Sequence, residues 1–402
     1  MVYACSSQME ERNMETSKTV FSQLLDFVPK RQFRRCVERY NGDHRVRTFS
    51  CWDQFLCMAF AQLTYRESLR DIEICLRNRT EQLYRIGLRG NVSRSTLADA
   101  NESRDSRIYA DLCQLLIQQA RTLYADEKFI KELDEVVYIL DSTYISLCLS
   151  LFPWAKFSPY KAAVKVHTLL DLRGAIPAFI AISRAKYRDN EMLDNILIEP
   201  GAFYVMDKAY IDFARLYNID QARAYFVTRS KKNLRFRRQY SRPVDKESGV
   251  RADQTIKLVG RVASGKYPNQ LRRIRYFNEQ NKIRLTFLTN NFNLSAETIA
   301  DLYKARWQIE VFFKWIKQNL RITSFYGTSF NAVRTQIWIA ISTYLLVAIV
   351  KKQLNIKTPL YQILQFLSLS LFDETPILRA FTPSHQSNFD PPANNQLNLF
   401  TS

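Results

Sequence analysis

The order of β-prone and helix-prone stretches after residue 134 is the feature that most narrows the possible folds of this chain. Apolar, β-prone runs end in polar turns, and stretches with the spacing of amphipathic helices lie between them. The expected strands cover residues 136–147, 162–171, 175–182, 203–207 and 225–229, and the expected helices cover 190–198 and 211–222. This order predicts a mixed sheet with covering helices, an α/β fold.

The stretches that flank this sheet have other patterns. Ser295 is a predicted N-cap where helical spacing returns after a β-prone, basic stretch. The predicted organisation is a flexible start (1–16), a helical N-terminal domain (17–130), a core in two pieces (131–230 and 291–330), a basic β-rich insertion (231–290), a helical C-terminal region (331–381) and a disordered tail (382–402).

Cysteine usage and the lack of export signals predict a cytoplasmic protein. The chain has seven cysteines and no Cys-x-x-Cys pair, which favours reduced, buried thiols over a zinc site. The N-terminus has no cationic start followed by an apolar run. The apolar stretch 338–350 is short and contains Ser342 and Thr343, so we expect a buried helix and no membrane span.

Positive charge is concentrated in one part of the chain. The formal net charge is +19, and residues 221–290 hold 18 basic against 4 acidic side chains, a net charge of +14. A solvated face rarely concentrates charge so strongly, whereas a surface that follows nucleic-acid phosphates does. The candidate phosphate-binding residues of this segment are Lys231, Lys232, Arg235, Arg237 and Arg238.

Two aspartates follow apolar, β-prone runs. Asp141 and Asp207 each begin a polar turn, and a carboxylate at the edge of a buried strand is costly unless it is paired, hydrogen-bonded or metal-bound. Each alone has a simpler explanation, as a strand-ending turn or a helix N-cap. Asp171 and Asp189 are further acids that could lie near the same site.

A third acid lies on a predicted helix, residues 303–317. At about 100° per residue, Glu310 shares a stripe with four potential phosphate-binding groups: Tyr303, Arg306, Lys314 and Lys317. A solvated amphipathic face is the alternative interpretation. Together the three acids suggest two divalent ions roughly 4 Å apart, and oxygen ligands favour Mg²⁺ or Mn²⁺.

The N-terminal region contains a weak DNA-binding pattern. Residues 64–72 and 92–104 resemble a helix-turn-helix with a long connection, and Ser93 is placed to cap the second helix. Arg94 and Arg104 would then face DNA. A plain helical bundle explains the same pattern.

The four residues Tyr303, Arg306, Glu310 and Lys317 stand in the spacing Y-x2-R-x3-E-x6-K. With the contexts Asp141-Ser-Thr and Asp207-Lys-Ala-Tyr, the chain resembles the insertion-sequence DDE transposases of the group named for that signature, over roughly residues 130–350. The resemblance implies a ribonuclease H-like core with a β-rich insertion. It also implies that Tyr303, Arg306 and Lys317 contact phosphates of the transposon end.

Two functions remain open. One is an active transposase that binds terminal inverted repeats, cleaves the element ends, and joins the 3′-hydroxyl to target DNA by cut-and-paste, as a homodimer on paired double-stranded ends. The other is a catalytically silent or regulatory DNA-binding relative. All three acids and the signature are intact, which favours the first.

Overall fold

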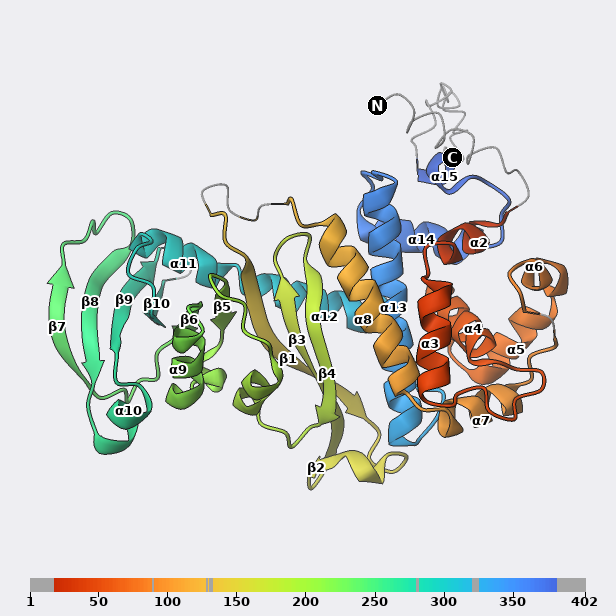
Figure 1. Ribbon diagram of the computed structural model, residues 1–402, viewed down its shortest axis with the longest axis horizontal. Helices are drawn as coiled ribbons and strands as arrows, with labels where there is room; N and C mark the ends of the chain where they lie inside the picture. The colour runs from red at the N-terminus through yellow and green to blue at the C-terminus, as the bar shows by residue number, and fades with distance from the viewer. Residues whose placement is uncertain are drawn as a thin grey trace, which may run out of the picture.

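The computed structural model of this chain describes residues 18–88, 90–127, 129, 133–279, 282–319 and 325–381. N-terminal helices lie at one end of the long axis, and a sheet extends to the other end (Figure 1). Two long helices, α8 (Arg107–Leu123) and α13 (Phe330–Gln353), pack side by side between them.

The N-terminal region is helical, and serine caps begin several of its helices. Ser50 and Asp53 form a reciprocal capping box. The Ser93 hydroxyl accepts a hydrogen bond from the Thr96 N–H, which confirms the predicted cap. The helices before α8 are α2 (Val20–Leu25), α3 (Lys30–Arg39), α4 (Cys51–Leu63), α5 (Leu69–Arg77), α6 (Thr80–Arg85) and α7 (Arg94–Ser103).

The structure confirms the predicted mixed sheet. Strand β1 pairs antiparallel with β3 and parallel with β5, and β5 pairs parallel with β6. Strand β4 pairs with β3 across the turn predicted at Arg173 and Gly174, where Gly174 has φ +69° against the Tyr124 ring. The strands are β1 (Val137–Leu147), β2 (Lys156–Ser158), β3 (Lys161–Asp171), β4 (Ile176–Arg184), β5 (Phe203–Met206) and β6 (Tyr225–Arg229).

The α-helix predicted over residues 190–198 does not form. The 3-10 helix η2 (Asp189–Asn195) takes its place, because polar side chains at five of its seven positions compete for backbone hydrogen bonds. Helix α9 (Phe213–Gln221) forms close to its predicted range, with Asp212 as its N-cap. Two short 3-10 helices complete this part, η1 (Pro153–Ala155) and η3 (Lys208–Tyr210).

The basic segment after residue 230 extends the core sheet. Its last strand pairs antiparallel with β6, so the sheet has ten strands in the order β2-β3-β1-β5-β6-β10-β9-β8-β7, with β4 also on β3. Strand β7 therefore lies at the far end of the sheet (Figure 1). The added elements are β7 (Phe236–Arg242), β8 (Val250–Leu258), α10 (Arg261–Lys266), β9 (Gln270–Asn278) and β10 (Ile283–Thr289).

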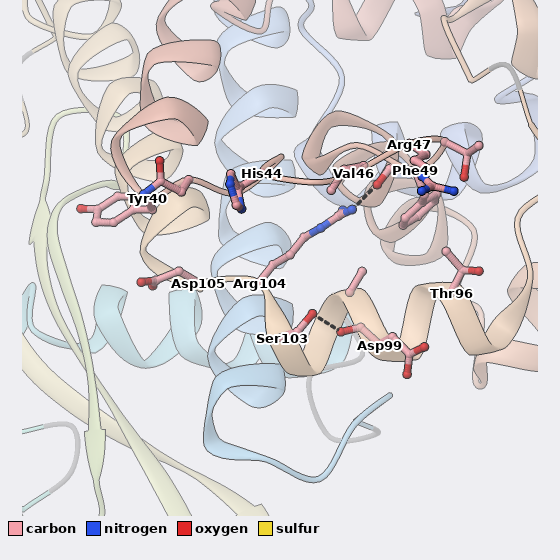
Figure 2. A pocket seen from close by; sticks show the side chains of 14 residues that line it. Tyr40, His44, Val46, Arg47, Phe49, Thr96, Asp99, Ser103, Arg104 and Asp105 are labelled. Atoms are coloured by element: carbon pink, nitrogen blue, oxygen red, sulfur yellow. Dashed lines mark hydrogen bonds between the residues drawn. The ribbon is translucent and has the colours of Figure 1, made fainter.

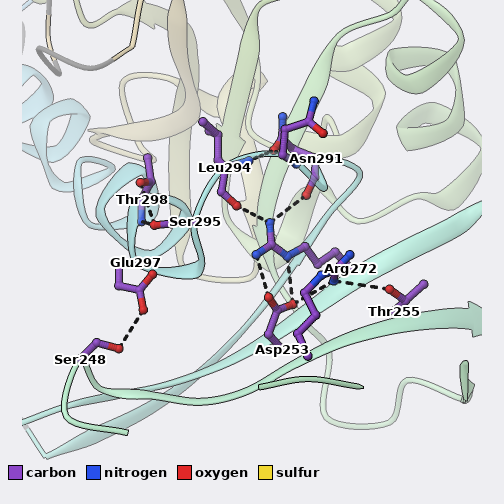
Figure 3. A network of polar contacts seen from close by, with 11 residues as sticks. Ser248, Asp253, Thr255, Arg272, Asn291, Leu294, Ser295, Glu297 and Thr298 are labelled. Atoms are coloured by element: carbon purple, nitrogen blue, oxygen red, sulfur yellow. Dashed lines mark hydrogen bonds and ion pairs between the residues drawn. The ribbon is translucent and has the colours of Figure 1, made fainter. Parts of the chain in front are cut away.

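A buried ion pair ties these added strands to the chain that leads into the next helix (Figure 3). The Arg272 guanidinium donates to both carboxylate oxygens of Asp253, at 2.9 and 2.7 Å, and to the Leu294 carbonyl at 2.6 Å. Ser248 donates to Glu297 at 2.8 Å nearby. The basic strands and the helix that follows Ser295 are thus held in one fixed relation.

The helix predicted to run without interruption through residues 303–317 is broken in the structure. Helix α11 (Ala296–Lys304) ends, and α12 (Trp307–Asn319) begins after Ala305 and Arg306. The Arg306, Gln308 and Ile309 N–H groups bond three residues back instead of four, which tightens the turn. Since neither break residue is Gly or Pro, we attribute the break to tertiary contacts of Arg306.

Helix α13 is the core helix of the C-terminal region. It is the one helix of the described residues that is long and apolar enough to cross a membrane, and 94% of its apolar window is buried inside the protein. That burial agrees with the predicted core helix. Helices α14 (Leu360–Ser370) and α15 (Ile377–Phe381) follow it.

Alternation along the strands assigns residues to the two faces of the sheet. Ile139 and Val205 join the apolar cluster that contains residues of α11, α12 and α13. Leu140 and Met206 join the cluster that contains residues of η2 and α9. Odd-numbered positions of β1 and β5 therefore face α11 and α12, and even-numbered positions face η2.

Candidate active site

Asp141 and Asp207 lie side by side where the parallel pairing of β1 with β5 ends. The last parallel pair of β1 and β5 is Leu140 opposite Met206, so the next residue along each segment is one of these aspartates. Asp207 follows the end of β5, whereas Asp141 lies inside β1, which continues, paired with β3, to Leu147, so the turn predicted at Asp141 does not form. Both are at odd-numbered positions and face α11 and α12. The Asp207 side chain makes no cap hydrogen bond to η3, so helix capping does not explain it.

Helices α11 and α12 bring the signature residues to these aspartates. The Tyr303 hydroxyl donates to Asp207 Oδ1 at 3.3 Å. The Arg306 guanidinium donates from Nη1 to Asp141 Oδ2 at 2.7 Å and from Nη2 to Glu310 Oε1. Through these contacts the three acids converge beside the break between the two helices.

Burial sets the electrostatics of this site. It raises the pKa of Asp141 to about 6, whereas the Ser142 N–H and Arg306 lower that pKa, and Asp207 and Glu310 raise it. Burial, with the Asp207 charge, also raises the pKa of Tyr303 to about 12, so its hydroxyl stays a donor. Negative charge is therefore concentrated where a cation would be favoured.

The donor chemistry of the site fits a hard divalent cation. Three carboxylates supply the oxygen ligands that Mg²⁺ and Mn²⁺ prefer. Within the ranges that the structure describes, however, no three acidic, His or Cys side chains are arranged so as to hold a metal ion. The Arg306 guanidinium lies between Asp141 and Glu310 instead.

The two lysines of the stripe lie further along α12. Lys314 follows Glu310 by one turn and is exposed. Lys317 lies one turn beyond and is partly buried, and burial lowers its pKa. Their DNA contacts stay predictions.

The comparison with known proteins agrees with this geometry. The sequence model of a family described as a transposase DDE domain matches residues 132–346, just over half of the chain. This chain belongs to the DDE transposase family. A second family, described only as a domain of unknown function, matches residues 16–89.

Named relatives support the assignment. A Sinorhizobium fredii protein named as transposase y4zB is 34% identical over 70% of this chain and 78% of its own length. A Geobacillus stearothermophilus protein named as a transposase for an insertion sequence element is 31% identical over 54% of this chain and 58% of its own length. A solved structure titled as a piggyBac transposase synaptic complex with hairpin DNA has a TM-score of 0.42 and 9% identity over 91% of this chain and 81% of its own, too remote a likeness to bear on function.

The predicted phosphate-binding residues of the basic segment are exposed in this transposase, and they fall in two places. Lys231, Lys232 and Arg235 precede β7, and Arg237 and Arg238 lie on it. Four strands, β6, β10, β9 and β8, separate β7 from β5 in the sheet (Figure 1). Arg237 and Arg238 therefore lie at the far end of the sheet. Lys231 and Lys232 instead follow β6, the neighbour of β5, and the Lys231 ammonium donates to the Ile211 carbonyl at 3.3 Å.

The N-terminal candidates fall beside a groove of about 530 Å³ between the 40–49 loop and α7 (Figure 2). Arg94 is exposed in the first turn of α7. The Arg104 guanidinium instead donates to the Phe49 and Ser50 carbonyls and lies over the Phe49 ring. Its donors are used within the fold, so the structure adds nothing to the predicted DNA contact of Arg104.

Asp189 belongs to a network on the opposite face of the sheet. It accepts from Ser142 Oγ at 2.6 Å and from the buried Lys165 Nζ at 3.2 Å. Ser142 follows Asp141 directly, and alternation turns the two side chains to opposite faces. Sequence reasoning missed Lys165 and His167, although two ionisable side chains in the apolar run 162–170 are a usable signal. Asp171 is bound by Arg173.

His167 makes stability depend on pH. Its side chain is fully buried, and burial lowers its pKa to about 4, with Asp189 raising and Lys165 lowering it. Because the unfolded chain takes up a proton near pH 6.5, the free energy of unfolding should fall by about 3 kcal/mol between pH 6.5 and 4 through this residue. When the free energy of unfolding is measured in urea at several pH values, this pH dependence should be missing from His167→Gln protein.

The exposed His44 supplies the control for this experiment. His44→Gln protein should keep the pH dependence of the wild-type chain. If the wild-type chain and His167→Gln lose stability in parallel between pH 6.5 and 4, His167 is not the group responsible.

Proposed function

We propose that this chain is the active transposase of an insertion sequence, in the group with the Y-x2-R-x3-E-x6-K signature. It would cleave element ends by metal-dependent phosphodiester hydrolysis and join the 3′-hydroxyl to target DNA. The convergence of Asp141, Asp207 and Glu310 through Arg306 and Tyr303 is the observation that carries this proposal. The sheet order β3-β1-β5-β6 fits a ribonuclease H-like core.

Each side chain of the site has a proposed role. The three carboxylates would hold Mg²⁺ or Mn²⁺, two ions in all, which would activate the attacking water or 3′-hydroxyl and stabilise the leaving oxygen. Arg306 and Lys317 would bind phosphates beside the cleaved bond, Lys314 would assist, and the Tyr303 hydroxyl would donate a hydrogen bond there.

Double-stranded DNA is the proposed partner, bound by two surfaces. The exposed row from Lys231 to Arg238 concentrates positive charge, which suits phosphate binding. Of its basic side chains, all in the described part of the chain, only Lys231 has an acceptor in the protein, the Ile211 carbonyl at 3.3 Å. The N-terminal helices would recognise the terminal inverted repeats. Because a transposition event uses two ends, a homodimer on paired ends and a cut-and-paste pathway remain part of the proposal, as does a cytoplasmic location.

The deciding experiment is a cleavage assay on duplexes that carry the element's own ends. The full chain with Mg²⁺ should nick the end strand and, on longer incubation, join the freed 3′-hydroxyl to a target duplex. A scrambled end of equal length is the control. Tight, end-specific binding without any cleavage would favour the regulatory alternative instead.

The basic row should govern the salt dependence of DNA binding. Replacing Arg235, Arg237 and Arg238 together with Gln should lower the slope of log affinity against log salt by about 0.9 per lost phosphate contact. Fluorescence anisotropy with end-bearing and scrambled duplexes should show an equal loss on both, since phosphate contacts carry no sequence information.

A single substitution elsewhere calibrates this measurement. Arg215→Gln removes a charge that already pairs with Asp194 and Asp212, so the salt slope should not change. An unchanged slope in the triple variant would show that the row does not lie against DNA.

A further inference from the structure

The side chain of Arg306 lies between two of the three carboxylates that would bind a metal ion. Its two terminal nitrogens contact different carboxylates, Asp141 Oδ2 at 2.7 Å and Glu310 Oε1. The other Asp141 oxygen accepts the Ser142 N–H at 2.8 Å. Both oxygens of Asp141 are therefore already engaged by groups of this chain.

The remaining acid is engaged in the same manner. Tyr303, in the last turn of α11, donates to Asp207 Oδ1. No three metal-ligating side chains stand ready for an ion within the described ranges. Arg306 and Tyr303 thus supply to the carboxylates the positive charge and hydrogen bonds that a bound cation would supply.

Arg306 and a divalent ion cannot share Asp141 favourably. The guanidinium lies within hydrogen-bond distance of the carboxylate, so an ion on the same oxygen would face a like charge only a few ångströms away. Arg306 also sits in the break between α11 and α12, and its side chain is 21% exposed, which leaves it a route towards solvent.

We infer that Arg306 is an internal counter-ion of the metal site, which must leave Asp141 before a divalent ion binds there and which a DNA phosphate draws away. This inference rests on the proposed function and adds a regulation to the same site. Phosphate is a bidentate partner for arginine, as carboxylate is, so the exchange keeps the guanidinium paired.

Coupling of the two ligands follows from this exchange. If DNA removes Arg306 from Asp141, DNA strengthens metal binding, and metal must strengthen DNA binding by the same factor. The chain without DNA would then hold metal weakly, and its hydrolytic site would be assembled mainly on DNA.

Mn²⁺ binding to the full chain tests the inference without relying on activity. Free Mn²⁺ is measured by electron paramagnetic resonance, with and without an end-bearing duplex. Without DNA, Arg306→Gln should bind Mn²⁺ at least about tenfold more tightly than the wild-type chain, a change of about 1.4 kcal/mol. Adding DNA should tighten binding to the wild-type chain and have much less effect on Arg306→Gln.

Two further variants separate this contact from general charge and from folding. Lys304→Gln removes an equal charge two residues away from a lysine that pairs with Asp301, and should bind Mn²⁺ as the wild-type chain does. Arg306→Lys keeps the charge but cannot span both carboxylates, so its Mn²⁺ affinity should be intermediate. If Arg306→Gln does not fold, Arg306→Lys is the variant compared with the wild-type chain.

The outcomes distinguish this inference from the proposed function. Equal Mn²⁺ affinity in the wild-type chain and in the folded Arg306 variants, or equal tightening by DNA in all of them, overturns the counter-ion role alone. Mn²⁺ binding that Asp141→Asn does not weaken in any background overturns the metal site, and with it the proposed function.

Discussion

Asp141→Asn protein is expected to bind element-end DNA and to cleave it at least about a thousandfold more slowly than the wild-type chain, a loss of about 4 kcal/mol in transition-state stabilisation. The amide keeps the shape of the side chain but removes the charge that a divalent ion needs. Asp207→Asn and Glu310→Gln should have effects of the same order, because each removes one of the three converging carboxylates. Single-turnover cleavage with Mg²⁺ measures this rate.

A neighbouring acid provides the matched control. Asp301 is an exposed carboxylate on α11 that pairs with Lys304, outside the converging set. Asp301→Asn should cleave at nearly the wild-type rate. Retained cleavage in Asp141→Asn protein, with DNA affinity unchanged, would contradict the catalytic assignment. Loss of cleavage together with loss of the thermal unfolding transition would instead indicate misfolding.

Arg272→Met should reduce the free energy of unfolding by about 3–5 kcal/mol, the largest effect on stability that we predict. The substitution leaves the carboxylate of Asp253, 5% exposed, with its buried bidentate partner gone. It also removes the donor to the Leu294 carbonyl (Figure 3). Urea unfolding followed by circular dichroism measures the change.

An exposed ion pair from the same strands gives the comparison. Arg251 pairs with Glu279 at 3.0 Å, but both side chains are more than a third exposed. Arg251→Met should therefore cost less than about 1 kcal/mol. Combining Arg272→Met with Asp253→Leu should recover part of the lost stability, since it removes a buried carboxylate that would otherwise keep only its 3.4 Å contact with Arg242. Equal effects of Arg272→Met and Arg251→Met would contradict the buried tether.

This tether also bears on catalysis. Arg272 joins β9 to the segment that begins α11, and the break after α11 carries Arg306. The strands that carry the basic row proposed to contact DNA are thereby held in a fixed position relative to the converging acids. The folded Arg272→Met protein should accordingly lose more in cleavage than in DNA affinity.

The sequence by itself predicted most strands and the candidate acids, because these depend on local residue chemistry. The β-prone runs that lead to Asp141 and Asp207 marked both the strands and the acids, because an acid that follows buried apolar residues needs a compensating partner. The turn expected at Asp141 did not form, since β1 continues to Leu147. The spacing of Tyr303, Arg306 and Glu310 predicted one functional surface, since helical geometry follows from residue number. The N-cap role of Ser93 was likewise predictable from local sequence, because a serine before a helical stretch favours that position.

Tertiary structure alone decided the remainder, because it depends on register and on partners distant in sequence. The parallel pairing of β1 with β5 put Asp141 beside Asp207, whereas strand alternation turned Ser142 and Asp189 to the opposite face. Arg104 donates to backbone carbonyls of the same chain, whereas its sequence context fits a DNA-facing side chain equally well. The Arg306 guanidinium donates to Asp141, and the helix is interrupted at Ala305 and Arg306. Neither residue is a helix breaker, so no local sequence pattern predicts this interruption.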